Sequence, residues 1–196
     1  MSGIKCLING YNNFFKKIFL KSPDKFKKLS KEQSPKILLI SCVDSRVDPA
    51  IITNAKLGEI MVVRNVANIV PSLKSGKDID STQSAIEFAV KIVKVNNIVV
   101  LGHSNCLGIK NLIYKKPNNK NLVYLNQWLE KAKDIRCNVT QTCLSSKKLL
   151  RVAEKENIRN SLNNLMSYPW IKKKVQEKTL SLNGLYFSIE TGLLYQ

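Results

Sequence analysis

Residues 37–46 read Ile37-Leu38-Leu39-Ile40-Ser41-Cys42-Val43-Asp44-Ser45-Arg46, and this apolar run ends abruptly in a thiol, a carboxylate and a guanidinium. A continuous apolar run of this kind is typical of a strand buried on both faces of a parallel sheet. In open α/β sheets, ligands bind in the crevice outside the carboxyl ends of the strands. The stretch therefore predicts a core strand over 36–42 that brings Cys42, Asp44 and Arg46 to such a crevice.

Segments typical of strands and helices alternate through the rest of the chain. Further strands are predicted at 59–64 and 98–101, a closing strand or hairpin at 180–187, and helices at 49–58, 81–95, 107–115, 121–135, 144–167 and 169–175. Such alternation predicts the α/β fold class, with a mostly parallel central β-sheet flanked by helices. Because the sequence has neither an internal repeat nor a linker, residues 1–196 are predicted to form a single domain.

Residues 1–34 are predicted to form an N-terminal helical arm ahead of the first core strand. Apolar residues recur near helical spacing over 4–20, and Ser22-Pro23-Asp24 is a typical helix start. The arm carries more aromatic residues than a free tail would. This composition favours packing of the arm on a partner subunit.

Composition narrows the class of protein. A chain of 196 residues, 44% of them hydrophobic, suits one domain with a substantial core. No apolar run is long enough to span a bilayer, and no signal peptide is recognised, so we expect a cytoplasmic protein without a membrane partner. The net charge of +18 comes from lysines scattered along the chain, without a basic run interleaved with aromatics. A lysine-rich surface is therefore favoured over nucleic-acid binding.

The chain has five cysteines, and the odd number argues against a disulfide framework. Cys6, Cys137 and Cys143 are expected to be small buried hydrophobic residues. Cys42 and Cys106 are different because both follow core strands.

The only histidine, His103, precedes Cys106 by three residues at the end of the strand predicted at 98–101. If that strand neighbours the first one, Cys42 reaches the same point. Two thiolates and one imidazole form a known type of catalytic zinc site with one open position. The alternative is a histidine that is hydrogen-bonded at a strand end beside an inert cysteine.

Asp44 and Arg46 lie two residues apart, so they point the same way on an extended chain. An arginine can hold a carboxylate with two hydrogen bonds. The pair is either a plain structural ion pair or, beside a zinc ion, a device that keeps Asp44 ionised and off the metal.

Several segments in order resemble the β-class carbonic anhydrases, over about residues 30–192. They are Cys42-Val43-Asp44-Ser45-Arg46-Val47, Val63-Arg64-Asn65-Val66-Ala67-Asn68, Ala85-Ile86-Glu87-Phe88-Ala89-Val90, Gly102-His103-Ser104-Asn105-Cys106, and Glu156-Asn157-Ile158 through Ser161-Leu162 to Tyr168-Pro169. The segment 63–68 and Gln33-Ser34-Pro35 look closest to the plant-like branch of that family.

The resemblance implies zinc-dependent reversible hydration of carbon dioxide to bicarbonate and a proton, with a zinc-bound hydroxide as the nucleophile. It implies one Zn²⁺ per chain, held by Cys42, His103 and Cys106, with Asp44 and Arg46 as a catalytic dyad. It also implies a homodimer or a larger homo-oligomer of dimers. The small substrate pocket of the family corresponds here to Gln33, Met61, Val66, Phe88, Leu107 and Gly108.

The sequence departs from the family at Leu107, where glycine is usual, and the leucine adds bulk beside the metal. Two alternatives follow: a non-catalytic zinc protein, or a hydrolase of a carbon dioxide analogue such as carbon disulfide. One branch of the family closes its site using a tryptophan, a glycine and a tyrosine, where this chain has Leu39, Ser41 and Phe187. We therefore expect Asp44 to stay off the metal at neutral pH.

Overall fold

The computed structural model describes residues 3–73, 79–114, 121–140 and 145–196. The chain divides into two compact units, Met1–Ser34 and Pro35–Gln196. In the first unit, α1 (Ile4–Phe14) continues as a π-helix (η1, Phe15–Phe19), and α2 (Pro23–Leu29) follows. Neither α1 nor α2 contains a buried residue.

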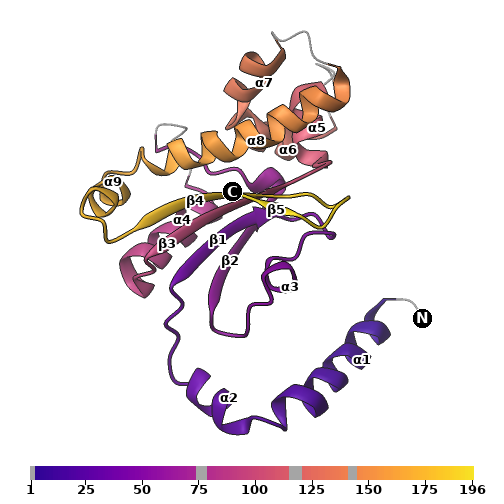
Figure 1. Cartoon of the computed structure of the whole chain (residues 1–196), viewed down its shortest axis with the longest axis vertical. Coiled ribbons are helices and arrows are strands. Elements are labelled where there is room, and N and C mark those ends of the chain that lie inside the picture. Colours follow the sequence, from indigo (N-terminus) through magenta and orange to yellow (C-terminus); the bar gives the residue numbers. More distant parts are fainter. Residues whose placement is uncertain (1–2, 74–78, 115–120, 141–144) are drawn as a thin grey trace. The chain divides into compact units, whose positions relative to one another are not determined.

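The second unit is built on a sheet with the strand order β2-β1-β3-β4-β5 (Figure 1). The strands are β1 (Ile37–Cys42), β2 (Ile60–Asn65), β3 (Asn97–His103), β4 (Ser181–Phe187) and β5 (Leu194–Tyr195). The first four are parallel to their neighbours, and β5 alone pairs antiparallel, with β4. The predicted α/β fold class with a mostly parallel sheet is confirmed.

The interior strand β1, between β2 and β3, is buried on both faces, as its apolar run predicts. Leu38 and Ile40 pack into the larger core beneath α8, whereas Leu39 faces a smaller cluster with Val47 and Leu101. Helix α3 (Pro49–Thr53) lies on the side of the sheet opposite α8 (Figure 1). It begins where the Asp48 carboxylate accepts hydrogen bonds from two N–H groups of its first turn.

The remaining helices of this unit connect and cover the strands. They are α4 (Ser81–Glu87), its π-helical continuation η3 (Phe88–Val93), α5 (Leu107–Tyr114), α6 (Val123–Glu130), α7 (Lys133–Thr140), α8 (Ser146–Leu165) and α9 (Pro169–Gln176), with a short 3₁₀ helix η2 (Val66–Asn68) after β2. None of the described helices is long and apolar enough to cross a membrane.

Two details differ from the sequence-based expectations, and one predicted alternative is decided. Residues 121–135 form two helices because the N–H groups of Lys131 and Ala132 bond carbonyls three residues back, which tightens the chain between α6 and α7. Of the two alternatives predicted at 180–187, the structure has the strand, β4, which is parallel to β3. Cys6 and Cys137 are exposed instead of buried, and Cys143 lies outside the described residues.

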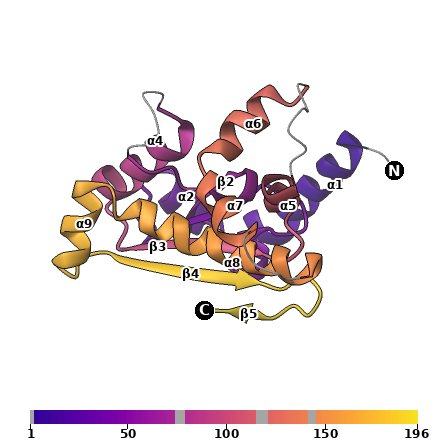
Figure 2. The same cartoon turned by 90° about the horizontal axis from the view of Figure 1, so that it is seen from above.

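The longest helix, α8, lies along β3 and β4 in both views (Figures 1 and 2). Its buried face contains apolar residues and, unusually, three polar ones, Glu154, Asn157 and Ser161. Gly184 of β4 allows the close approach, since a Cβ atom there would lie 2.7 Å from Ile158 Cγ2.

We predict that Gly184→Ala destabilises the second unit by about 1–3 kcal/mol, the usual range for overpacking a core. Ile158 Cγ2 sits on a branched Cβ, so it cannot move aside without a change of rotamer or backbone. The free energy of unfolding from denaturant titration measures the effect. Gly10→Ala is the control, because its new methyl group meets nothing within 4 Å. Equal stability of the Gly184 variant and the wild type would contradict this account of the α8–β4 contact.

Candidate metal centre

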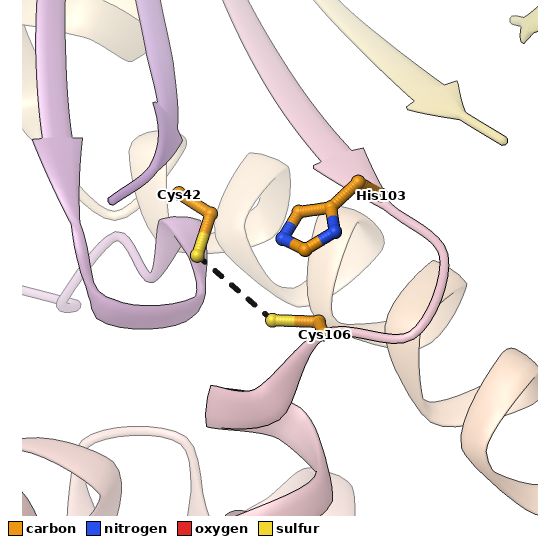
Figure 3. Close-up of side chains that lie close together, drawn as sticks. All are labelled: Cys42, His103 and Cys106. Atoms are coloured by element: carbon orange, nitrogen blue, oxygen red, sulfur yellow. Dashed lines mark hydrogen bonds between the residues drawn. The ribbon is translucent and has the colours of Figure 1, made fainter. Parts of the chain in front are cut away.

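Cys42 and His103 come together because β1 and β3 are adjacent parallel strands that end at the same edge of the sheet. The register pairs Ser41 with Leu101, and Cys42 and His103 are the last residues of their strands. The chain then turns within three residues, so that Cys106, just before α5, faces back toward both (Figure 3). The three side chains predicted to bind a metal thus meet at one point.

The cluster has the geometry and the donor set of a zinc site. One ligand atom from each residue lies within 4.8 Å of the others, and all three residues are buried. The Sγ atoms of Cys42 and Cys106 are 3.9 Å apart. Two sulfurs bound to one tetrahedral zinc at about 2.3 Å would lie about 3.8 Å apart. The residues present therefore fit a zinc ion.

His103 is oriented for coordination. Its Nδ1 lies 3.0 Å from the carbonyl oxygen of Ser104, and its buried Nε2 has no hydrogen-bond partner. An unpartnered buried nitrogen costs about 1–3 kcal/mol. A metal ion bound to Nε2 would remove that cost, and the Ser104 carbonyl would fix the ring in the required tautomer.

The two thiols influence each other strongly. The hydrogen bond between them is the main reason why the pKa of Cys42 falls to about 4, and the N–H of Ala67 adds a weaker bond to the same sulfur at 3.4 Å. The same bond raises the pKa of Cys106, and burial raises it further. The pair therefore consists of a thiolate at Cys42 and a thiol at Cys106. A metal cation that binds both sulfurs displaces the proton of the thiol.

Asp44 stands beside the cluster without joining it. Its two carboxylate oxygens accept hydrogen bonds from Arg46 Nε at 2.9 Å and Nη2 at 2.7 Å, and one of them also accepts the backbone N–H of Arg46. These bonds hold the pKa of the Asp44 carboxyl well below its usual range. Its Oδ2 is 3.9 Å from His103 Nε2. Arg46 also donates to the carbonyl oxygen of Asn105, which ties this pair to the loop of Cys106.

Arg64, at the end of β2, holds the loop that carries the dyad, a role that the sequence did not indicate. Its guanidinium donates to the carbonyl oxygens of Cys42 at 3.0 Å, Asp44 at 2.8 Å and Val47 at 3.1 Å. It also lies 3.4 Å from the carboxylate of Asp48. The signals in the sequence were its position at the end of a core strand and its place in the family-like segment 63–68.

Glu154 on α8 holds the backbone of Cys106 in place, and this role was not predicted from the sequence. One carboxylate oxygen accepts the N–H of Cys106 at 2.9 Å, and the other accepts the hydroxyl of Tyr186 at 2.8 Å. Burial raises the pKa of both Glu154 and Tyr186, so the tyrosine stays a donor. A glutamate on the buried face of a helix was the available signal.

The turn after β2 presents a backbone donor to Cys42. Ala67 has a φ of 65°, a conformation that costs a non-glycine residue roughly 1–2 kcal/mol. Side-chain hydrogen bonds hold the turn in place, from Trp128 to the carbonyl of Val66 and from Asn157 to that of Ala67. These two donors, which come from other helices and are buried or half-buried, thus offset the strain and keep Ala67 in this conformation.

A cavity of about 430 Å³ lies against the cluster and is lined by Cys42, Val43, Asp44, Ser45, Arg46, Leu107, Gly108, Asn111 and Leu125. Leu107 is 64% exposed at the start of α5, so its bulk does not fill the centre. Gly108 is the constrained position, because a Cβ there would lie 2.9 Å from Ala67 Cβ and 3.2 Å from the Ala67 nitrogen. The close contact between the start of α5 and the turn at Ala67 therefore requires glycine at position 108, whereas position 107 tolerates a side chain.

Four other residues expected in the pocket do not line this cavity. Val66 packs on the core near Gly108, Met61 packs on the larger core, and Phe88 is 42% exposed at the start of η3. Gln33 belongs to the first unit. Their contribution to a substrate pocket stays a prediction.

The chain is similar to known proteins in both sequence and fold. Residues 37–194 match the sequence family described as carbonic anhydrase. The chain is 36% identical, over 179 residues, to β carbonic anhydrase 6, mitochondrial, of Arabidopsis thaliana. The chain belongs to the β-class carbonic anhydrase family. The match covers 90% of the chain and 61% of the Arabidopsis protein, so the chain spans less than two thirds of that relative's length.

Solved structures of β-carbonic anhydrases have the same fold. The β-carbonic anhydrase CcaA superposes with a TM-score of 0.92 at 35% identity, covering 97% of this chain and 86% of CcaA. A tetrameric β-carbonic anhydrase of the ascomycete Sordaria macrospora gives a TM-score of 0.85 at 30% identity, covering 97% and 94%. The resemblance to this family predicted from the sequence is confirmed.

We predict that Glu154→Gln weakens zinc binding by about 10- to 100-fold, the usual effect of losing a residue that orients a metal ligand. The amide has one acceptor oxygen; if this oxygen accepts the Cys106 N–H, the NH2 group faces Tyr186, whose hydroxyl must turn to accept, and the negative charge that accepts both bonds in the wild type is lost. Competition with a zinc chelator measures the affinity. Glu156→Gln on the same helix is the matched control, because within the described part of the chain its carboxylate has an ion pair with Arg159 at the surface and none with the metal-binding loop. Equal affinities of the two variants would rule out the supporting role of Glu154.

Proposed function

We propose that this protein catalyses the reversible hydration of carbon dioxide to bicarbonate and a proton, with one zinc ion per chain. The observation that carries the proposal is the buried group of Cys42, His103 and Cys106 with the Asp44 carboxylate held beside it. Membership of the β-class carbonic anhydrase family supports the same activity.

Cys42, His103 and Cys106 would hold the metal and leave one side of it open toward the cavity. A zinc ion held in this way is a Lewis acid that lowers the pKa of a bound water, so that hydroxide is available near neutral pH. The protein's own contribution is to fix the two thiolates and the imidazole and to keep the fourth position free.

Asp44 would accept a hydrogen bond from the attacking water and orient it. The bonds from Arg46 keep the carboxylate ionised and turned away from the metal position. Arg46 donates a hydrogen bond to each Asp44 oxygen, so the carboxylate is held in a fixed position. The carboxylate could bind the metal only after Arg46 had released it. We therefore propose that the form in which Asp44 is not bound to the metal predominates at neutral pH.

The cavity beside the cluster suits a small apolar substrate. Val43, Leu107 and Leu125 supply apolar surface close to Cys42, and the Asp44–Arg46 pair supplies the polar end. A cavity open beside the metal position favours catalysis over a purely structural zinc site. It gives no specific support to hydrolysis of carbon disulfide.

A homodimer or larger assembly is proposed as the active form. Ile4, Leu7 and Tyr11 of α1 are between 59% and 70% exposed, which is unusual for a helix that functions alone. The similar β-carbonic anhydrases of Sordaria macrospora are tetrameric. Contacts between the arm and a partner, and pocket residues supplied by that partner, are part of this proposal, as is a cytoplasmic location.

We expect Cys42→Ser to lose zinc and Asp44→Asn to keep it. The serine variant lacks one of the three ligands, whereas the asparagine variant keeps all of them but presents a neutral side chain to the attacking water. Zinc analysis should give about one ion per chain for the wild type and Asp44→Asn, while stopped-flow hydration should fall at least about 100-fold in Asp44→Asn. Full activity of zinc-free Cys42→Ser would refute the proposed function.

A dependence of turnover on external buffer is also predicted. The one histidine of the chain is a proposed metal ligand, so no histidine remains to carry the released proton to solvent. The maximal hydration rate should therefore rise with buffer concentration at constant pH and ionic strength. A maximal rate that stays high as the buffer is diluted would instead indicate an internal route through a tyrosine or carboxylate.

A further inference from the structure

A second cavity, of about 110 Å³, lies behind the metal-binding loop and is separate from the one that opens onto the metal site. It is formed between α8 and the segment from the end of β4 to β5, which lie side by side in Figures 1 and 2. Its walls include Ser104 and Asn105, the two residues between His103 and Cys106. Its floor includes the Glu154–Tyr186 pair.

Cations without a carboxylate partner face this cavity. Lys147 and Arg151 line it from successive turns of α8, and among the described residues neither forms an ion pair with a carboxylate. Lys155, one turn further on, lies 5.4 Å from the ring centre of Tyr186 and 6.0 Å from that of Tyr195. Two positive charges therefore line the cavity, and a third, that of Lys155, lies over two of its tyrosines.

The polar groups inside the cavity are mostly hydrogen-bond donors. Ser188 and Thr191 contribute hydroxyls opposite α8, and Ser104 contributes a third, whereas the hydroxyl of Tyr186 already donates to Glu154. The buried carboxylate of Glu154 is already engaged by Cys106 N–H and Tyr186 OH. Glu190 is the other acid of the lining, and it is exposed at the rim, where its side chain can turn to solvent.

The size of the cavity limits what can bind. Its volume of about 110 Å³ is roughly a quarter of that of the cavity beside the metal centre. A nucleotide is too large, whereas an ion of a few heavy atoms fits. Guanidinium and ammonium groups together with hydroxyls are the groups that recognise phosphate-like oxyanions.

We propose that this cavity binds a small oxyanion dianion, represented by inorganic phosphate. Arg151 and Lys147 would neutralise its charge, and the hydroxyls of Ser188 and Thr191 would donate to its oxygens from the other wall. An ion held between α8 and the β4–β5 segment would add a link between these two elements, which already meet along β4 and through Lys155 over Tyr195.

Binding there is coupled to the metal site by the floor of the cavity. Glu154 and Tyr186 contact both the cavity and, through the N–H of Cys106, the ligand loop. An anion that fixes α8 against β4 would fix Glu154 and with it Cys106. This second step rests on the proposed zinc site, and we expect phosphate to slow the loss of zinc to a chelator.

Calorimetric titration of the zinc-loaded protein with sodium phosphate tests the binding, at a pH above the second pKa of inorganic phosphate, which is higher than the ~6 of a phosphate monoester. Sodium chloride at the same ionic strength controls for general screening. Lys147→Gln/Arg151→Gln should lose this binding. Lys148→Gln/Lys172→Gln, which removes the same charge from exposed positions of α8 and α9 outside the cavity, should retain it.

The variants also separate this site from phosphate bound at the zinc. Binding that persists unchanged in Lys147→Gln/Arg151→Gln, or that is lost equally in the control variant, would overturn the proposal. The rate of zinc loss should fall about fivefold or more with phosphate in the wild type and the control, within the usual range of coupling between sites. If phosphate binds but does not change the rate of zinc loss, the coupling is contradicted and the binding site is not. If the protein lacks hydration activity in phosphate-free buffer, the proposed function is contradicted and the phosphate site is not.

Discussion

The parallel pairing of β1 with β3 is the contact on which the metal centre depends. Adjacent parallel strands end at the same edge of a sheet, so the pairing brings Cys42 and His103 together although sixty residues separate them in the sequence. The apolar residues of both strands drive this pairing by burial on two faces. A shift of one residue in the register of β1 would turn the Cys42 side chain to the opposite face and away from the other two ligands.

Polar side chains from neighbouring elements then hold the loops that follow these strands. Arg64 fixes the loop of Asp44, Trp128 and Asn157 fix the strained turn at Ala67, and Glu154 fixes the N–H of Cys106. Loops at strand ends have few backbone partners of their own. These supports make the ligand positions rigid, which a metal site requires if its members are to stay within a fraction of an ångström of a productive arrangement.

Much of this site could be predicted because its residue types are rare in their positions. A thiol, a carboxylate and a guanidinium at the end of an apolar strand are unusual, and the one histidine followed by Cys106 leaves few alternatives for a metal. The effect of Leu107 could not be judged in the same way. Whether a side chain at 107 fills the cavity depends on the direction in which α5 begins, and the structure shows that the tight backbone contact falls on Gly108.

The sequence by itself determined the order of strands and helices and the group of residues that ends the two core strands, because hydrophobic periodicity and residue type are local properties. The tertiary structure alone decided which polar residues support that group. Arg64 and Glu154 act across 20 and 48 residues, respectively, so the neighbouring sequence could place one at a strand end and the other on a helix but could not indicate which backbone groups they hold. Their roles arise only when folding buries them beside backbone groups that lack other partners, since a buried donor or acceptor must be satisfied by whatever the packing brings near.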